Sequence, residues 1–138
     1  MSDFLVLRVV AKLLLPFILL FALYVQFHGD YGPGGGFQAG VIFGAGFILY
    51  GLIFGLDVLR SILSSDTLRV GFASGVLIYA LTGVATLILG GNYLDYNVLA
   101  HDPVDGQHLG ILVIEFGVGL TVASVMVSIF YYFAGRGR

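Results

Sequence analysis

Long apolar runs alternate with short polar segments along the chain. Each run has about 20 residues, the length that an α-helix needs to cross the hydrocarbon core of a membrane. The four runs are Leu5–Phe27, Phe37–Leu56, Val70–Gly90 and Leu109–Phe133. This pattern predicts an all-α integral membrane protein with four transmembrane helices, in which residues 1–138 form a single transmembrane domain.

The first run is preceded by basic residues, as the apolar part of a signal peptide would be. It ends, however, in Tyr-Val-Gln-Phe-His without the small residues of a cleavage site. We therefore expect a retained membrane anchor.

The basic residues indicate the orientation of the four helices. They lie near the first residue of the chain, around the connection between the second and third runs, and at the last residues: Arg8, Lys12, Arg60, Arg69, Arg136 and Arg138. All six therefore fall on one side of the membrane, which the positive-inside rule assigns to the cytoplasm. The expected topology has both termini in the cytoplasm and the segment around residues 29–36 outside.

The composition supports a membrane protein and excludes several classes of function. Of 138 residues, 59% are hydrophobic and 10% charged, an apolar content that a soluble fold of this size could not bury. The chain has no cysteine and no convincing spacing of metal ligands. It also has no basic patch for nucleic acid and no nucleophile with an evident base. We expect no enzyme activity, no cofactor and no metal site.

The segment His28–Gly40 combines glycines with polar side chains between the first two runs. Glycine allows positive φ angles, and Pro33 fixes one φ angle, so a compact turn is expected. We interpret it as the shaped entry to the second helix, in which the glycines allow close contact with a neighbour and Gln38 can form a hydrogen bond. The residues assigned to this loop and contact are Pro33, Gly34, Gly35, Gly36, Phe37 and Gln38.

Small residues recur at helical spacing in the last three runs. In the second run Gly40, Gly44, Gly51 and Gly55 fall within a stripe about 60° wide. Stripes of this kind let transmembrane helices approach closely. These helices are expected either to pack on one another or to dock against another subunit. The first run has almost no small residues, so we expect it at the periphery against lipid.

Ionisable residues at membrane depth are candidates for function because they are costly there. Glu115 lies roughly 9 Å inside the fourth run and about 140° from its small-residue stripe. It could belong to a proton or cation path, pair with a partner subunit, or be a hydrogen-bonded carboxyl near the interface. An orientation away from the stripe favours a partner or a cavity.

Three further residues are weaker candidates for an ion path. Lys12 is close enough to the membrane surface for its side chain to extend to water. Asp57 is expected to form a solvated pair with Arg60 one turn later, or to serve with it as an anchor at the membrane surface. His28 ends the first run, where it could relay protons or form an interfacial hydrogen bond.

Two motifs resemble those of the MnhB family, whose members are small subunits of the Mrp-type multisubunit Na⁺/H⁺ antiporters. His28-Gly followed by Pro33-Gly-Gly-Gly-Phe-Gln38-Ala-Gly40 is similar to the family pattern His-Gly-x-x-x-Pro-Gly-Gly-Gly-Phe-Gln-Gly-Gly, and Glu115-Phe-Gly-Val-Gly-Leu-Thr-Val122 is similar to its fourth-helix segment. Asp30 stands where the family often has a second histidine, and Ala39 where it has glycine. The first departure weakens any mechanism that needs a histidine pair.

The resemblance implies an accessory subunit of a complex that exchanges Na⁺ for H⁺ across a bacterial or archaeal plasma membrane. Its partners would be the other membrane subunits and the lipid bilayer, and it would assist assembly or line an ion path. Two alternatives stay open: a purely structural subunit of this complex or of a complex I-related or hydrogenase-related one, and a small transporter formed by self-association.

Overall fold

The computed structural model describes residues 5–28, 35–99, 101 and 103–135, and over these residues the chain is almost entirely helical. The elements in chain order are α1 (Leu5–His28), α2 (Gly36–Phe54), α3 (Leu56–Ile62), α4 (Ser65–Ile88), the 3-10 helix η2 (Tyr96–Leu99) and α5 (Pro103–Ala134). Helices α1, α2, α4 and the part of α5 from Gly106 are long and apolar enough to cross a membrane. The expected all-α fold with four such helices is therefore confirmed.

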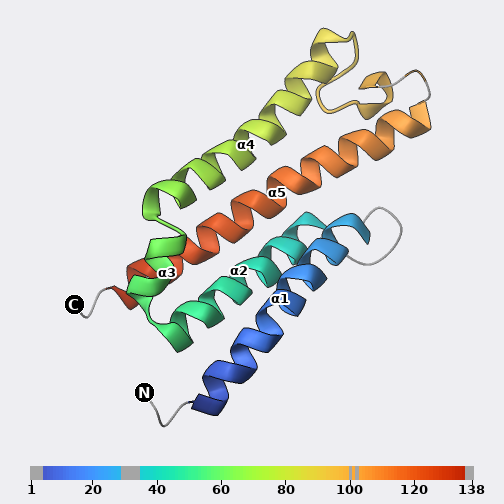
Figure 1. Cartoon of the computed structure of the whole chain (residues 1–138). Coiled ribbons are helices and arrows are strands. Elements are labelled where there is room, and N and C mark those ends of the chain that lie inside the picture. Colours follow the sequence, from blue (N-terminus) through green and yellow to red (C-terminus); the bar gives the residue numbers. More distant parts are fainter. Residues whose placement is uncertain (1–4, 29–34, 100, 102, 136–138) are drawn as a thin grey trace.

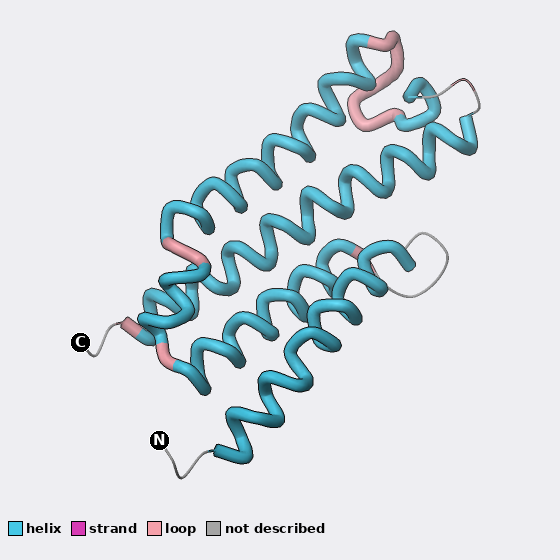
Figure 2. The backbone as a smooth tube through the Cα atoms, viewed as in Figure 1, coloured by secondary structure: helices cyan, strands magenta, loops and turns pink. Residues whose placement is uncertain are grey.

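The four long helices form a single layer in the order α1, α2, α5, α4 (Figures 1 and 2). Helix α5, the last in sequence, lies between α2 and α4 and packs extensively on both. Helix α1 packs mainly on α2, so it occupies one edge, as expected for the run with almost no small residues. Because the layer is one helix thick, many large apolar side chains on both faces remain exposed within the chain.

Glycine backbone forms the contact between α2 and α5. A Cβ atom added to Gly40 would lie 2.7 Å from the carbonyl oxygen of Gly119 and 2.8 Å from Cβ of Val122. One added to Gly36 would overlap the backbone carbonyl of Glu115. The contact is looser at Gly44, where the nearest atom would be 3.4 Å away. The small-residue stripe of α2 thus packs inside the chain.

The contact between α4 and α5 has the same character. Gly75 faces Gly117 and Thr121 so closely that an added Cβ would lie 2.6 Å from the carbonyl oxygen of Gly117, and Gly71 faces Ser124. Helix α5 therefore carries two small-residue faces, one for each neighbour. Of the two arrangements left open by the sequence, packing between these helices is the one observed.

Large side chains fill the contacts around α3, at the end of the layer where α2 finishes and α4 begins. A buried cluster consists of Leu56, Leu59, Leu68, Val127 and Tyr131. The phenol of Tyr131 donates a hydrogen bond to the carbonyl oxygen of Leu63 at 2.6 Å, which ties α5 to the α3–α4 connection. Gly51 also packs here, against Leu59 and Phe130.

Gly55 has a conformational role rather than the packing role suggested by its place in the stripe. Its φ angle is 108°, and an added Cβ would meet no atom within 4 Å. This left-handed backbone conformation favours glycine. The second helix consequently ends at Phe54 instead of continuing to Leu56, and α3 starts as a separate element.

The helices of the layer differ in length. At 1.5 Å per residue, α5 with 32 residues is about 48 Å long and α2 with 19 residues about 28 Å. Figure 1 shows that α4 and α5 extend past the end where α1 finishes and α2 begins. We call this the η2 end of the layer, and the opposite end, which holds α3, the α3 end.

Candidate functional site

The four ion-path candidates are divided between the two ends of the layer. His28 is the last residue of α1 and Glu115 lies beside the first residues of α2, so both are at the η2 end. Lys12 and Asp57 are at the α3 end, where Lys12 lies close to the last residue of α2 and Asp57 is in the first turn of α3. The structure therefore brings together at most two of the four.

Glu115 lies directly against the start of α2. Its Oε1 atom is 2.9 Å from the position that a Cβ atom of Gly35 would occupy, and its backbone contacts Gly36. Gly35 is buried and has a φ angle of 146°, so both space and backbone conformation favour glycine. Glu115 thus points to the start of α2. The sequence had favoured a partner subunit or a cavity as the surface that it faces.

The start of α2 is an electrostatically favourable place for a carboxylate. The first N–H groups of a helix have no acceptors within the helix, and the helix dipole gives this end a partial positive charge. Gly35 at the N-cap has no side chain to offer, and Gln38 is exposed in the first turn. Half-buried Glu115 therefore supplies negative charge where α2 has none of its own.

Gln26 of α1 lies at the junction where the start of α2 meets α5 around Gly119. This residue was not identified from the sequence. Its side chain is only 6% exposed, and its Oε1 atom is 2.9 Å from the position of a Cβ atom at Gly119. Within the described ranges its Nε2 atom is buried without a hydrogen-bond partner. An uncharged amide in an apolar run attracts little attention in sequence, yet here it touches the α2–α5 contact.

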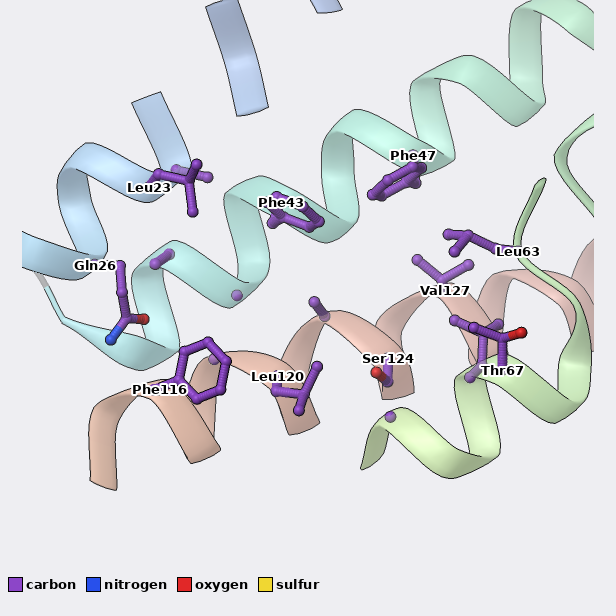
Figure 3. A pocket seen from close by; sticks show the side chains of 17 residues that line it. Leu23, Gln26, Phe43, Phe47, Leu63, Thr67, Phe116, Leu120, Ser124 and Val127 are labelled. Carbon is purple, nitrogen blue, oxygen red and sulfur yellow. The ribbon is translucent and has the colours of Figure 1, made fainter. Parts of the chain in front are cut away.

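A groove of about 300 Å³ extends from this junction along one face of the layer. Figure 3 shows Gln26 and Phe116 at one end, and Leu63 and Thr67 at the other. The walls between them are almost entirely apolar. Such a groove can accommodate an apolar side chain or lipid chain, but it offers no path for an ion.

His28 has an aromatic partner on its own helix. Its ring stacks on that of Tyr24, with centroids 5.1 Å apart and an interplanar angle of 14°. The imidazole is half-buried, so it is accessible at the η2 end. Stacking on Tyr24 does not by itself place His28 in an ion path.

The α3 end shows how cations are accommodated outside the apolar zone. The Nζ atom of Lys12 lies 5.4 Å from the ring centroid of Phe54, and the guanidinium of Arg8 lies 5.1 Å from it. Both cations therefore lie over the ring at the last residue of α2. That Lys12 extends to the membrane surface stays a prediction.

The carboxylates at this end lie in polar surroundings. Asp57 is exposed, while its expected partner Arg60 stacks over the ring of Tyr131 at 5.3 Å. An exposed ion pair with i, i+3 spacing joins Asp66 and Arg69, at 3.4 Å. An exposed pair of this kind contributes little to stability.

The predicted loop residues fall into two groups. Pro33 and Gly34 lie outside the described residues. Phe37 and Gln38 are exposed on the first turn of α2, so they are available to a neighbour, whereas Gly35 and Gly36 are buried against α5.

At the start of α2, the groups brought near one another are the carboxylate of Glu115, the imidazole of His28 and the amide of Gln26. These groups can bind or release a proton or hold a cation. Over the described ranges, no three His, Cys, Asp or Glu side chains gather as they would around a metal ion.

Comparison with known proteins places the chain in a family. Residues 6–128 match a family described as a domain related to the MnhB subunit of Na⁺/H⁺ antiporter. A protein of Staphylococcus haemolyticus assigned as antiporter subunit mnhB2 is 35% identical over 133 residues, covering 94% of each chain. A Staphylococcus aureus protein with the same assignment is 34% identical with equal coverage. The chain therefore belongs to the family of proteins related to the MnhB subunit of Na⁺/H⁺ antiporters.

Proposed function

We propose that this chain is an accessory membrane subunit of a multisubunit Na⁺/H⁺ antiporter. The observation that carries the proposal is its family membership over nearly the whole chain. The fold supports it, because a layer one helix thick leaves both faces open to other membrane subunits or lipid. Na⁺ and H⁺ are then the ions transported by the complex.

The distribution of charge supports one orientation in the membrane. The four described basic residues lie at the α3 end: Arg8, Lys12, Arg60 and Arg69. Both ends of the described chain lie there as well (Figure 1). By the positive-inside rule this end faces the cytoplasm of a bacterial or archaeal cell, so both termini are cytoplasmic and the η2 end is outside. The protein is accordingly a multi-pass protein of the plasma membrane.

Within the complex, Glu115 is our proposed contribution to the ion path. Its carboxylate lies beside the first residues of α2, at a level that the longer helix α5 passes. Because the side chain is only half-buried, it can exchange ions at the outer face. His28 lies at the same end and could supply a second titratable group. The competing function is purely structural, in which Glu115 only completes the start of α2.

The small number of ionisable groups in the apolar runs argues against a transporter made of this chain alone. Coupled exchange needs a path through the membrane, and the candidates at the two ends are separated by apolar helix contacts and an apolar groove. Transport through the complex therefore has to use groups of other subunits as well.

Purification of the tagged full chain in mild detergent tests the proposed function. We expect it to co-purify with other membrane subunits, and we expect the complex, but not the separated chain, to exchange Na⁺ for H⁺ in liposomes. A monodisperse homo-oligomer that exchanges ions alone would contradict the proposal.

A further inference from the structure

A second cavity, of about 290 Å³, lies at the α3 end between α3, α4 and α5. Unlike the groove near Gln26, it is lined by cations and hydroxyl groups. Arg60 comes from α3, Ser65 and Arg69 from α4, and Ser128 from α5. The ion path proposed above uses none of these residues.

The aromatic floor of the cavity fixes one of the two arginines. Tyr131 is almost completely buried and its hydroxyl is bonded to the Leu63 carbonyl, so its ring is a rigid platform. The guanidinium of Arg60 lies 5.3 Å from the centroid of that ring. Stacking orients a guanidinium while leaving its N–H donors free to bind an anion.

The second arginine can also accept an additional anion. Arg69 pairs with Asp66, but the side chains of the two residues are 68% and 87% exposed, so the pair is solvated and weak. Its guanidinium has five N–H donors in a planar fork, which matches the oxygen atoms of a phosphate. Ser65 begins α4, which adds the positive end of a helix dipole.

The acidic groups at this end lie outside the cavity. Of the described basic residues at this end, Arg60 and Arg69 line the cavity, and the acidic residues there are Asp57 and Asp66. Both aspartates are exposed, and neither lines the cavity. The lining of the cavity therefore presents two guanidinium groups and no carboxylate.

The position of the cavity points to a lipid rather than a soluble anion. Ser65 begins one candidate membrane span and Tyr131 is three residues from the end of another, at Ala134, so the cavity lies at the level of the head groups. Phe72 forms part of its wall, and the exposed side chains of Val76 and Tyr79 follow on the same face of α4. A lipid with its phosphate at the arginines could lay an acyl chain along this face.

We propose that the cavity between α3, α4 and α5 binds the phosphate of an anionic phospholipid through Arg60 and Arg69. Its volume is enough for a phosphate and adjoining glycerol, with the tails left outside against α4. Basic pockets between transmembrane helices at the cytoplasmic surface bind acidic head groups in this way. A lipid bound in this way would link α3, through Arg60, to the adjacent membrane leaflet.

The test compares lipid binding by the full chain, purified with its accompanying subunits, in three forms. The forms are the unchanged protein, the double variant Arg60→Gln with Arg69→Gln, and a matched control, Arg8→Gln with Lys12→Gln. The control removes two charges from the same end without touching the cavity. Retention of dioleoylphosphatidylglycerol is titrated by native mass spectrometry, with dioleoylglycerol, which lacks the phosphate, as the reference lipid.

We expect the cavity variant to bind phosphatidylglycerol about tenfold more weakly and the control variant to bind it normally. Binding of the reference lipid should be weak in all three forms. Equal loss in both variants, or no loss in either, would overturn the proposal. Displacement of the lipid by millimolar inorganic phosphate would identify a site for free phosphate and would also overturn it.

A folding defect is separated from a binding defect by Arg60→Lys with Arg69→Lys. This variant keeps both charges but lacks the planar fork. Intermediate lipid affinity is expected. If the lysine variant has normal thermal stability but binds no more lipid than the glutamine variant, positive charge at the cavity is not what holds the lipid, and the proposal fails.

Discussion

The two ends of the helical layer are held together by different kinds of contact. At the η2 end, α2 and α5 meet through glycine backbone, with Gly36 and Gly40 against Glu115 and Gly119. At the α3 end, large side chains such as Leu59, with the hydrogen-bonded Tyr131, fill the interface. The first end positions a carboxylate, whereas the second provides the buried core.

This difference determines how each end responds to change. A side chain in a packed cluster can adopt another rotamer to accommodate an altered neighbour, but a backbone carbonyl facing a glycine cannot move without moving its helix. Small additions should therefore be more damaging at the η2 end. At the α3 end, removal of a single hydrogen-bonding group such as the Tyr131 hydroxyl should lower the stability of the fold.

The largest effect is expected from one added methyl group at Gly40. In Gly40→Ala the new Cβ would meet the Gly119 carbonyl and Val122, forcing α2 and α5 apart at a cost of about 1–3 kcal/mol. The matched control is Gly44→Ala, where the nearest atom is at ordinary contact distance. Native gels should show much less assembled complex for the first variant and a normal amount for the second. Equal amounts would contradict the backbone contact described here.

A smaller effect is expected from Tyr131→Phe at the α3 end. Removing the hydroxyl leaves the Leu63 carbonyl without that donor while the ring stays in place, which should cost about 1–2 kcal/mol. The midpoint of thermal unfolding in detergent should fall. The control is Tyr132→Phe, at a position that is 80% exposed. If both variants unfold at the temperature of the unchanged protein, the hydrogen bond does not stabilise this end.

The sequence predicted the long helices well because their apolar runs are long and distinct. It was less accurate at their ends. The helix expected from Val70 begins at Ser65, since the polar stretch before it contains an N-cap: the Ser64 hydroxyl accepts a hydrogen bond from the Thr67 N–H. The length of an apolar run predicts the membrane-spanning part of a helix, whereas capping residues determine where the helix begins.

Long-range arrangement was beyond what the sequence could provide. Glu115 was identifiable as a carboxylate in an apolar run, and the stripe predicted close packing. Neither feature shows that α5 inserts between α2 and α4, and only that order places Glu115 at the start of α2. Gln26 was missed for the same reason, because an amide becomes notable only when its surroundings are known.

The most direct test of this account is Na⁺/H⁺ exchange by complexes that contain Glu115→Gln. Glutamine keeps the shape of the side chain at Gly35 but removes its charge and its ability to exchange a proton. The matched control, Asp66→Asn, removes a carboxylate from an exposed ion pair at the other end. With equal amounts of assembled complex, we expect exchange to fall at least severalfold across the pH range for Glu115→Gln alone. Unchanged exchange at every pH would contradict a role for Glu115 in the ion path and would leave it as a structural group at the start of α2.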